Sequence, residues 1–175
     1  MTIEFTASGG HLDPARIAAL EGTLRVKLPE DYREFLLQYN SALPEGNVYR
    51  EDKAITAGEY LFGISPDRGH DLVVQNREVY ANRLPRGILA IAQASGGNLI
   101  CLQMSDGSVY FWDHELEAGA DEDPCYENMV KLAVSFREFL ERLGIYRRED
   151  FFPNSSKVVS VKLRPGFQEK FKKYM

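Results

Sequence analysis

The first forty residues place apolar side chains at helical spacing, which predicts two consecutive helices. Asp13 and Pro14 start the first, because Asp caps free amides and Pro suits the first helical position, and the helix ends near Arg25. The second starts at Leu28–Pro29, with two acids in its first turn, and ends near Asn40. Its apolar residues recur at i, i+3, i+4 and i+7 and should face inward: Tyr32, Phe35, Leu36 and Tyr39.

The next segment has a weaker pattern. Residues 41–59 are typical of a loop with one short strand near Val48–Tyr49, and Tyr60–Ile64 is typical of a strand. Asp71 can cap a helix that runs to about Asn82, because apolar residues follow it at a rough helical period.

Three apolar runs with short polar links then predict an antiparallel meander of strands over 87–92, 98–104 and 109–113. Asp106–Gly107 is typical of a tight hairpin turn, because such turns need positive φ angles. A last helix should begin after Ser135, which caps it and has Glu138 three residues later.

The sequence therefore predicts an α+β fold, with a mainly antiparallel sheet of about four to six strands flanked by about four helices. We expect this domain over residues 1–144, with Gly144 well placed to end its last helix. Residues 145–175 form a basic C-terminal extension, in which Lys157–Leu163 alternates apolar and polar positions and should add a strand to the same domain.

Composition narrows the class of protein. The 175 residues, 44% of them hydrophobic, suffice for one core without disulfides or metal. The sequence has no signal-peptide pattern and no apolar run long enough to span a bilayer, so we expect a cytoplasmic protein with no membrane partner. Its two cysteines, Cys101 and Cys125, fit a reducing compartment, and Cys101 lies in an apolar run typical of a core.

Four motifs follow one another in residues 13–144: Leu28–Pro29 with Tyr32, Phe35–Leu36 and Asn40; Ile91–Leu102; Gly107–Glu115; and Ser135–Leu140. In this order and spacing they resemble the SUKH superfamily. The chain departs from the family pattern at Ser41–Ala42, where Gly-Gly is usual. Known members are similar to fungal cell-wall-assembly regulators of the Smi/Knr type, or to bacterial immunity proteins that neutralise polymorphic toxins, often nucleases.

The resemblance implies a non-catalytic protein-binding domain with no cofactor. The leading hypothesis is an immunity protein for a toxin domain with a basic surface, and the alternative is a regulator or scaffold in cell-envelope processes. We expect a monomer or a weak dimer.

No residue cluster makes a strong case for catalysis or a metal. Asp113, His114 and Glu115 place carboxylates beside an imidazole, but neighbours on a strand point to opposite faces. Ser95 lacks the Gly-x-Ser-x-Gly pattern of a nucleophile elbow. We therefore predict no enzyme activity and no metal site.

Charge is uneven along the chain. Residues 1–144 carry 13 Lys and Arg against 23 Asp and Glu, whereas residues 145–175 carry 8 against 3. No Lys or Arg lies between Arg86 and Lys131, which argues against a nucleic-acid partner, because phosphates need neutralisation.

The acidic segment after the third meander strand is the candidate partner-binding site. The candidate residues are Trp112, Asp113, Glu115, Glu117, Asp121, Glu122, Asp123 and Tyr126. The carboxylates would attract a basic partner, with Trp112 or Tyr126 as the aromatic anchor. The alternative is a solvated loop, in which case the partner would bind elsewhere, first around Ser41–Glu59.

Overall fold

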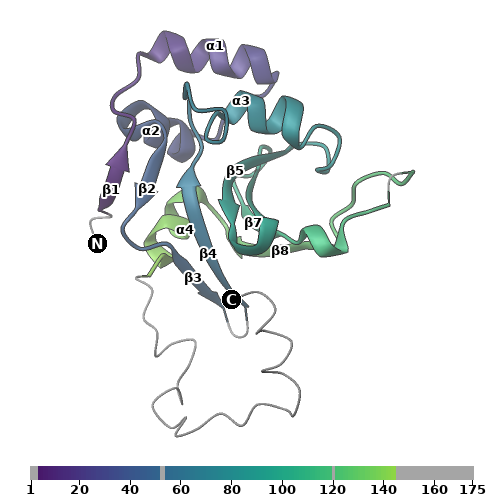
Figure 1. Cartoon of the computed structure of the whole chain (residues 1–175). Coiled ribbons are helices and arrows are strands. Elements are labelled where there is room, and N and C mark those ends of the chain that lie inside the picture. The colour runs from purple at the N-terminus through teal and green to yellow at the C-terminus, as the bar shows by residue number, and fades with distance from the viewer. Residues whose placement is uncertain (1–3, 52–53, 120, 145–175) are drawn as a thin grey trace, which may run out of the picture. The chain divides into compact units, whose positions relative to one another are not determined.

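The computed structural model describes residues 4–51, 54–119 and 121–144 (Figure 1). In these ranges the fold is α+β with a mainly antiparallel sheet, which confirms the predicted fold class. The helices of the described ranges are α1 (Pro14–Leu24), α2 (Glu30–Tyr39), α3 (Leu72–Val74) and α4 (Phe136–Arg142). The predicted strand over Lys157–Leu163, and the rest of the C-terminal extension, lie outside the described residues.

The described strands form one eight-stranded sheet in the order β1-β2-β4-β5-β6-β7-β8, with β3 paired to β4. All of these pairings are antiparallel. The strands are β1 (Phe5–Ser8), β2 (Ala42–Pro44), β3 (Val48–Glu51), β4 (Ala54–Leu61), β5 (Ile88–Ala94), β6 (Leu99–Gln103), β7 (Val109–Trp112) and β8 (Met129–Ala133). The predicted meander is present as β5, β6 and β7, and Gly107 has the positive φ angle, 76°, in the link between β6 and β7.

The helix ends follow the predicted capping chemistry. The Asp13 carboxylate accepts a hydrogen bond from the Ala15 amide at 2.7 Å, and Arg25 ends α1 in the left-handed region. Asn40 ends α2 with a φ of 58°. Its side-chain amide also donates to the Ile64 carbonyl at 2.9 Å and accepts from the Ile64 amide at 2.8 Å, so it ties α2 to the segment after β4.

Four segments differ from the expectation. Residues 5–8 form β1, which the sequence pattern did not predict. The predicted loop over 41–59 contains β2, β3 and the first part of β4, and β4 ends at Leu61 rather than Ile64. Asp71 caps α3 as expected, by accepting from the Val74 amide at 2.9 Å, but a π-helical turn over Gln75–Val79 replaces the regular helix. The sequence pattern also missed β8, which precedes α4 directly.

The core lies between the sheet and the helices, and α2 packs against α4 (Figure 1). The Phe136 ring lies 4.9 Å from that of Tyr32 and 5.1 Å from that of Phe35, and all three side chains are buried. Cys101 is also buried, and Cys125 is exposed; neither forms a disulfide. No helix in the described ranges is long and apolar enough to cross a membrane.

Candidate partner-binding surface

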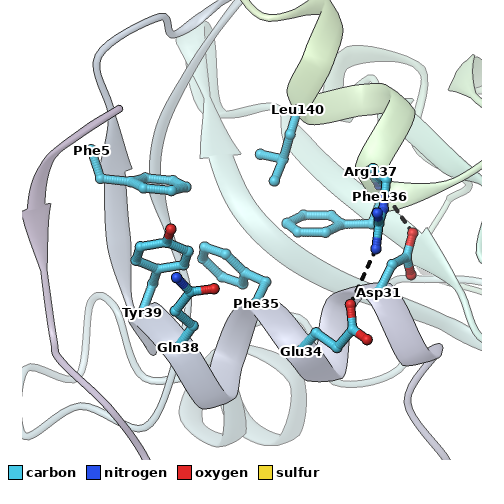
Figure 2. A pocket seen from close by; sticks show the side chains of 9 residues that line it. All are labelled: Phe5, Asp31, Glu34, Phe35, Gln38, Tyr39, Phe136, Arg137 and Leu140. Atoms are coloured by element: carbon cyan, nitrogen blue, oxygen red, sulfur yellow. Dashed lines mark hydrogen bonds and ion pairs between the residues drawn. The ribbon is translucent and has the colours of Figure 1, made fainter. Parts of the chain in front are cut away.

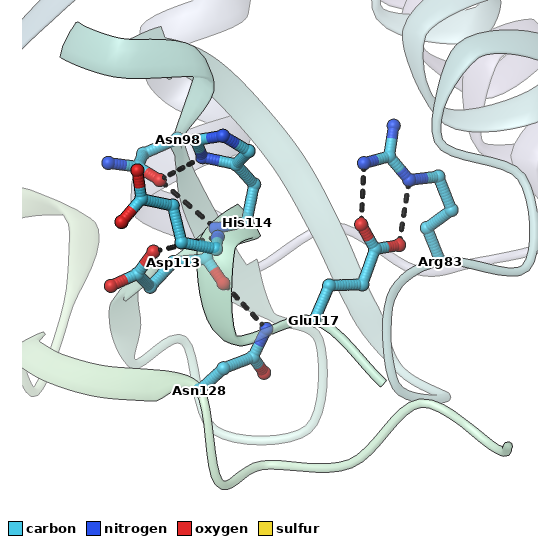
Figure 3. A network of polar contacts seen from close by, with 7 residues as sticks. Arg83, Asn98, Asp113, His114, Glu117 and Asn128 are labelled. Atoms are coloured by element: carbon cyan, nitrogen blue, oxygen red, sulfur yellow. Dashed lines mark hydrogen bonds and ion pairs between the residues drawn. The ribbon is translucent and has the colours of Figure 1, made fainter. Parts of the chain in front are cut away.

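The end of β7 carries the chain from the core to the acidic segment, residues 113–127, which we call the acidic loop. Asp113 stands at its start, and its carboxylate accepts from the Glu115 amide at 3.0 Å, so it caps the short 3-10 turn His114–Leu116. The Asp113 amide donates to the Asn128 carbonyl at 2.9 Å. The Asn128 side chain donates to the Asp113 carbonyl, also at 2.9 Å (Figure 3). The two ends of the loop are therefore fastened to each other.

The His114 side chain is held by an amide. Asn98 Oδ1 accepts from the His114 backbone amide at 3.0 Å and lies 2.8 Å from the ring Nδ1 (Figure 3). Asn98 thus orients the imidazole. The carboxylates of Asp113 and Glu115, the other members of the candidate acid–base cluster, do not. Across the described residues, no three or more His, Cys, Asp or Glu side chains gather as metal ligands would.

A bidentate ion pair attaches the loop to the core. Arg83 Nε and Nη2 lie 2.8 and 2.6 Å from the two carboxylate oxygens of Glu117 (Figure 3). The guanidinium carbon of Arg83 lies 5.4 Å from the ring centroid of Trp112 and 5.2 Å from that of Tyr80. Arg83 therefore joins the loop to two core aromatic rings, through charge on one side and cation–π contact on the other.

The ion pair changes the acid–base properties of both partners. The hydrogen bonds from Arg83, helped by its charge, hold the pKa of the Glu117 carboxyl below its ordinary value, against the opposing effect of partial burial. The hydrogen bonds that Arg83 donates to Glu117 in turn raise the pKa of Arg83. Both groups therefore remain charged at neutral pH, and the loop remains attached there.

The candidate residues fall into two sets by exposure. Asp113 and Glu117 are half-buried, and their carboxylates are used in holding the loop. Four carboxylate residues are exposed: Glu115, Asp121, Glu122 and Asp123. Glu122 also accepts from the Gly119 amide at 3.2 Å, which folds the loop back on itself.

The two candidate aromatic anchors lie in different environments. Trp112 is 1% exposed and packs edge-on against Tyr80, so it belongs to the core beneath the loop. Tyr126 is 47% exposed, and its hydroxyl donates to Gln103 Oε1 at 3.3 Å. Of the two candidate anchors, Tyr126 is therefore the one whose side chain is accessible.

Comparison with known proteins identifies the family. Residues 11–142 match the SMI1 / KNR4 family (SUKH-1), a range that runs through α1, α2, α3 and α4. The chain belongs to this family. The SUKH resemblance predicted from the sequence is thereby confirmed. The SPbeta prophage-derived protein YokK of Bacillus subtilis (strain 168) is 29% identical over 166 residues, which cover 78% of this chain and 79% of the relative.

Sequence reasoning missed the residues outside the acidic loop that hold it: Arg83, Asn98 and Asn128. Arg83 lies 34 positions before Glu117, in a segment whose sequence shows no periodic pattern. The available signal was indirect: Arg83 and Arg86 are the last basic residues before the long stretch that contains only acidic charges. The attachment depends on the tertiary fold, which brings the two segments together.

Proposed function

We propose that this chain is a non-catalytic, cytoplasmic protein-binding domain of the immunity type, which binds and neutralises a toxin domain with a basic surface. Membership of the SUKH-1 family supports this function, because the family generally comprises immunity or regulatory proteins without a catalytic role. The prophage origin of the Bacillus subtilis relative fits it as well. The observation that carries the proposal is a run of exposed carboxylates on a loop whose ends are fastened.

The physical case begins with the partner. A toxin that cleaves nucleic acid needs a positive cleft to hold phosphates. A surface with Glu115, Asp121, Glu122 and Asp123 exposed, and no Lys or Arg within the loop, presents the opposite charge to such a cleft. Opposite fields accelerate encounter and disfavour wrong partners. Tyr126 would then supply apolar contact area that the charges lack.

The fastened loop adds to this case. A loop that becomes ordered only on binding loses conformational entropy at that moment, which weakens the complex. Here Asp113, Asn128 and the Glu117–Arg83 ion pair hold the loop before any partner arrives. We therefore propose that Asp113 and Glu117 position the loop and that the four exposed carboxylates contact the toxin.

The family description favours a second candidate function, a regulator or scaffold of the SMI1 / KNR4 type. The two candidates differ in the partner they need. An immunity protein requires a toxin, so the neighbouring gene should encode a large protein with a C-terminal toxin domain. A regulator requires no such neighbour.

Co-expression tests the proposed function directly. The C-terminal domain encoded by the neighbouring gene is expressed in a host that it arrests, with or without the full chain. We expect the chain to restore growth and the purified proteins to form a complex. A chain in which Asp121, Glu122 and Asp123 are replaced by Asn, Gln and Asn should protect less well. Continued growth arrest despite abundant, folded wild-type chain would refute the immunity function.

A further inference from the structure

A small apolar hollow opens where α2, α4 and β1 meet. Its walls are Phe5 from β1, Phe35 and Tyr39 from α2, and Phe136 and Leu140 from α4. The Phe5 ring lies 4.4 Å from the ring of Tyr39 and 5.8 Å from that of Phe35. Figure 2 shows these side chains around one space, with Asp31, Glu34 and Arg137 on one side of it.

The size and the lining of the hollow limit what can fill it. Its volume is about 200 Å³, which is below the roughly 300–1,000 Å³ of pockets that hold drug-sized ligands or cofactors. A bound water needs two to four polar partners, and four of the five wall side chains, those of Phe5, Phe35, Phe136 and Leu140, have no polar atom. The hollow therefore fits one large apolar side chain.

The rim indicates the charge of the occupant. It carries two carboxylates, of Asp31 and Glu34, against one guanidinium, of Arg137. Asp31 is committed within the fold, because its two oxygens accept from the Tyr32 amide at 2.9 Å and the Arg137 amide at 3.0 Å. Glu34 pairs with the Arg137 side chain at 3.1 Å, and these side chains are 57% and 66% exposed. An ion pair that exposed is weak, so Glu34 can exchange its partner for a cation on the occupant.

We infer that the hollow is a docking site for an aromatic or large aliphatic side chain that has a Lys or Arg beside it, on a segment of a partner protein. The inference rests on the proposed function only in taking the occupant to be a protein. It adds an apolar anchor site, formed by α2, α4 and β1, whose lining includes no residue of the acidic loop. Apolar side chains seated in well-packed pockets contribute more to protein affinity than exposed charge pairs do.

The probe is the peptide acetyl-Lys-Trp-Lys-amide, compared with acetyl-Lys-Ala-Lys-amide, titrated into the full chain and followed by NMR. The Trp peptide should cause saturable shifts in α2 and α4, with a dissociation constant on the order of millimolar, because a single anchor must offset the cost of association. The Ala peptide should bind about tenfold more weakly or not measurably. Equal shifts from the two peptides would overturn the inference.

Two pairs of variants locate the binding. Gln38 lies exposed at the rim, so Gln38→Trp should fill the hollow and reduce binding to the level of the Ala peptide, whereas Gln38→Ala should bind as the wild type does. Glu34→Gln should weaken binding about two- to fivefold, and Glu141→Gln, an exposed change on α4 away from the lining, should not. Wild-type affinity in Gln38→Trp would overturn the inference.

A last comparison separates this inference from the proposed function. Replacing Asp121, Glu122 and Asp123 should leave peptide binding unchanged, because these residues do not line the hollow. If the chain binds the Trp peptide but fails to neutralise the toxin, the proposed function is wrong and the docking site stands. Shifts in α2 and α4 that depend on protein concentration without peptide would make the occupant a second copy and overturn the inference.

Discussion

Arg83 and Glu117 lie 34 positions apart in the chain, yet their side chains meet through two parallel hydrogen bonds of 2.8 and 2.6 Å. The same guanidinium lies over the rings of Tyr80 and Trp112. A largely exposed loop is thereby attached to a buried aromatic pair. The acidic loop should therefore be preorganised, and the first two predictions test this attachment.

Removing the charge of Glu117 should loosen the loop without unfolding the domain. The Arg83 and Glu117 side chains are 39% and 23% exposed, so solvent screens the ion pair. Glu117→Gln should therefore lower the free energy of unfolding by about 1 kcal/mol. Amide hydrogen exchange in the acidic loop should become faster, while exchange in β6 stays slow. Glu115→Gln is the matched control, because Glu115 is exposed. Equal loop exchange in Glu117→Gln and wild type would contradict the attachment.

The attachment should also depend on pH. Because hydrogen bonds from Arg83 lower the pKa of Glu117 in the folded state, the pair contributes stability above the unfolded-state pKa of about 4.3. That contribution is lost as the pH falls through the lower folded-state pKa. An NMR titration of the Glu117 carboxyl carbon should show its midpoint rising in Arg83→Met. The stability difference between this variant and wild type should shrink in acid, and an unchanged midpoint would contradict the assigned cause.

The core should be sensitive to loss of its aromatic side chains. Phe139 is 2% exposed and stacks on Tyr49 at 6.0 Å. Phe139→Ala should therefore lower the free energy of unfolding by roughly 3–5 kcal/mol, measured by chemical denaturation. Val134→Ala is the control, because Val134 is 63% exposed and should cost less than about 0.5 kcal/mol. Similar costs for the two substitutions would place Phe139 outside a packed core.

The two cysteines should differ in reactivity. Burial raises the pKa of the Cys101 thiol, and the thiolate is the reactive form, whereas Cys125 is exposed. A thiol reagent should therefore label one site, Cys125, in the native protein and both sites after denaturation, as measured by mass spectrometry. Rapid native labelling of Cys101 would show that β6 opens readily.

Short sequence patterns predicted the elements that depend on interactions between residues close together in the chain. The caps Asp13, Asp71 and Ser135 are visible in sequence because a capping residue acts within three positions of itself. The β5–β7 meander is visible because its apolar runs are separated by short turns. β4 was placed too late, since four of its first six residues, Ala54, Ala57, Gly58 and Glu59, are of types depleted in strands.

Other features depend on contacts that no local pattern encodes. β8 was missed because, as an edge strand, it buries only part of its length: Val130 is 50% exposed and Leu132 is 2% exposed. The exposure of Trp112 and Tyr126 could not be ranked from sequence, because burial of Trp112 depends on Tyr80, which comes from a different segment. The role of Arg83 depends on the same tertiary approach.

The most informative functional test is the rate at which the acidic loop meets its partner. If the exposed carboxylates steer association, replacing Asp121, Glu122 and Asp123 by Asn, Gln and Asn should slow association with the toxin domain by about tenfold at low salt. It should also flatten the dependence of the rate on ionic strength, because screening then has less charge to act on. Stopped-flow kinetics over a range of salt concentrations measures both effects.

The control for this test is a second triple variant with the same total charge, in which the substitutions lie outside the acidic loop. Glu4, Glu78 and Glu141 are exposed and lie outside both the acidic loop and residues 41–59, so replacing all three by Gln also removes three negative charges. If overall charge alone matters, the two triple variants will slow association equally. We expect the loop variant to be slower, because steering depends on charge near the contact surface within a Debye length of about 10 Å at 0.1 M salt. If the loop variant associates at the wild-type rate, these carboxylates are only solvated and do not steer association. The partner would then bind elsewhere, and residues 41–59 would be the first region to test.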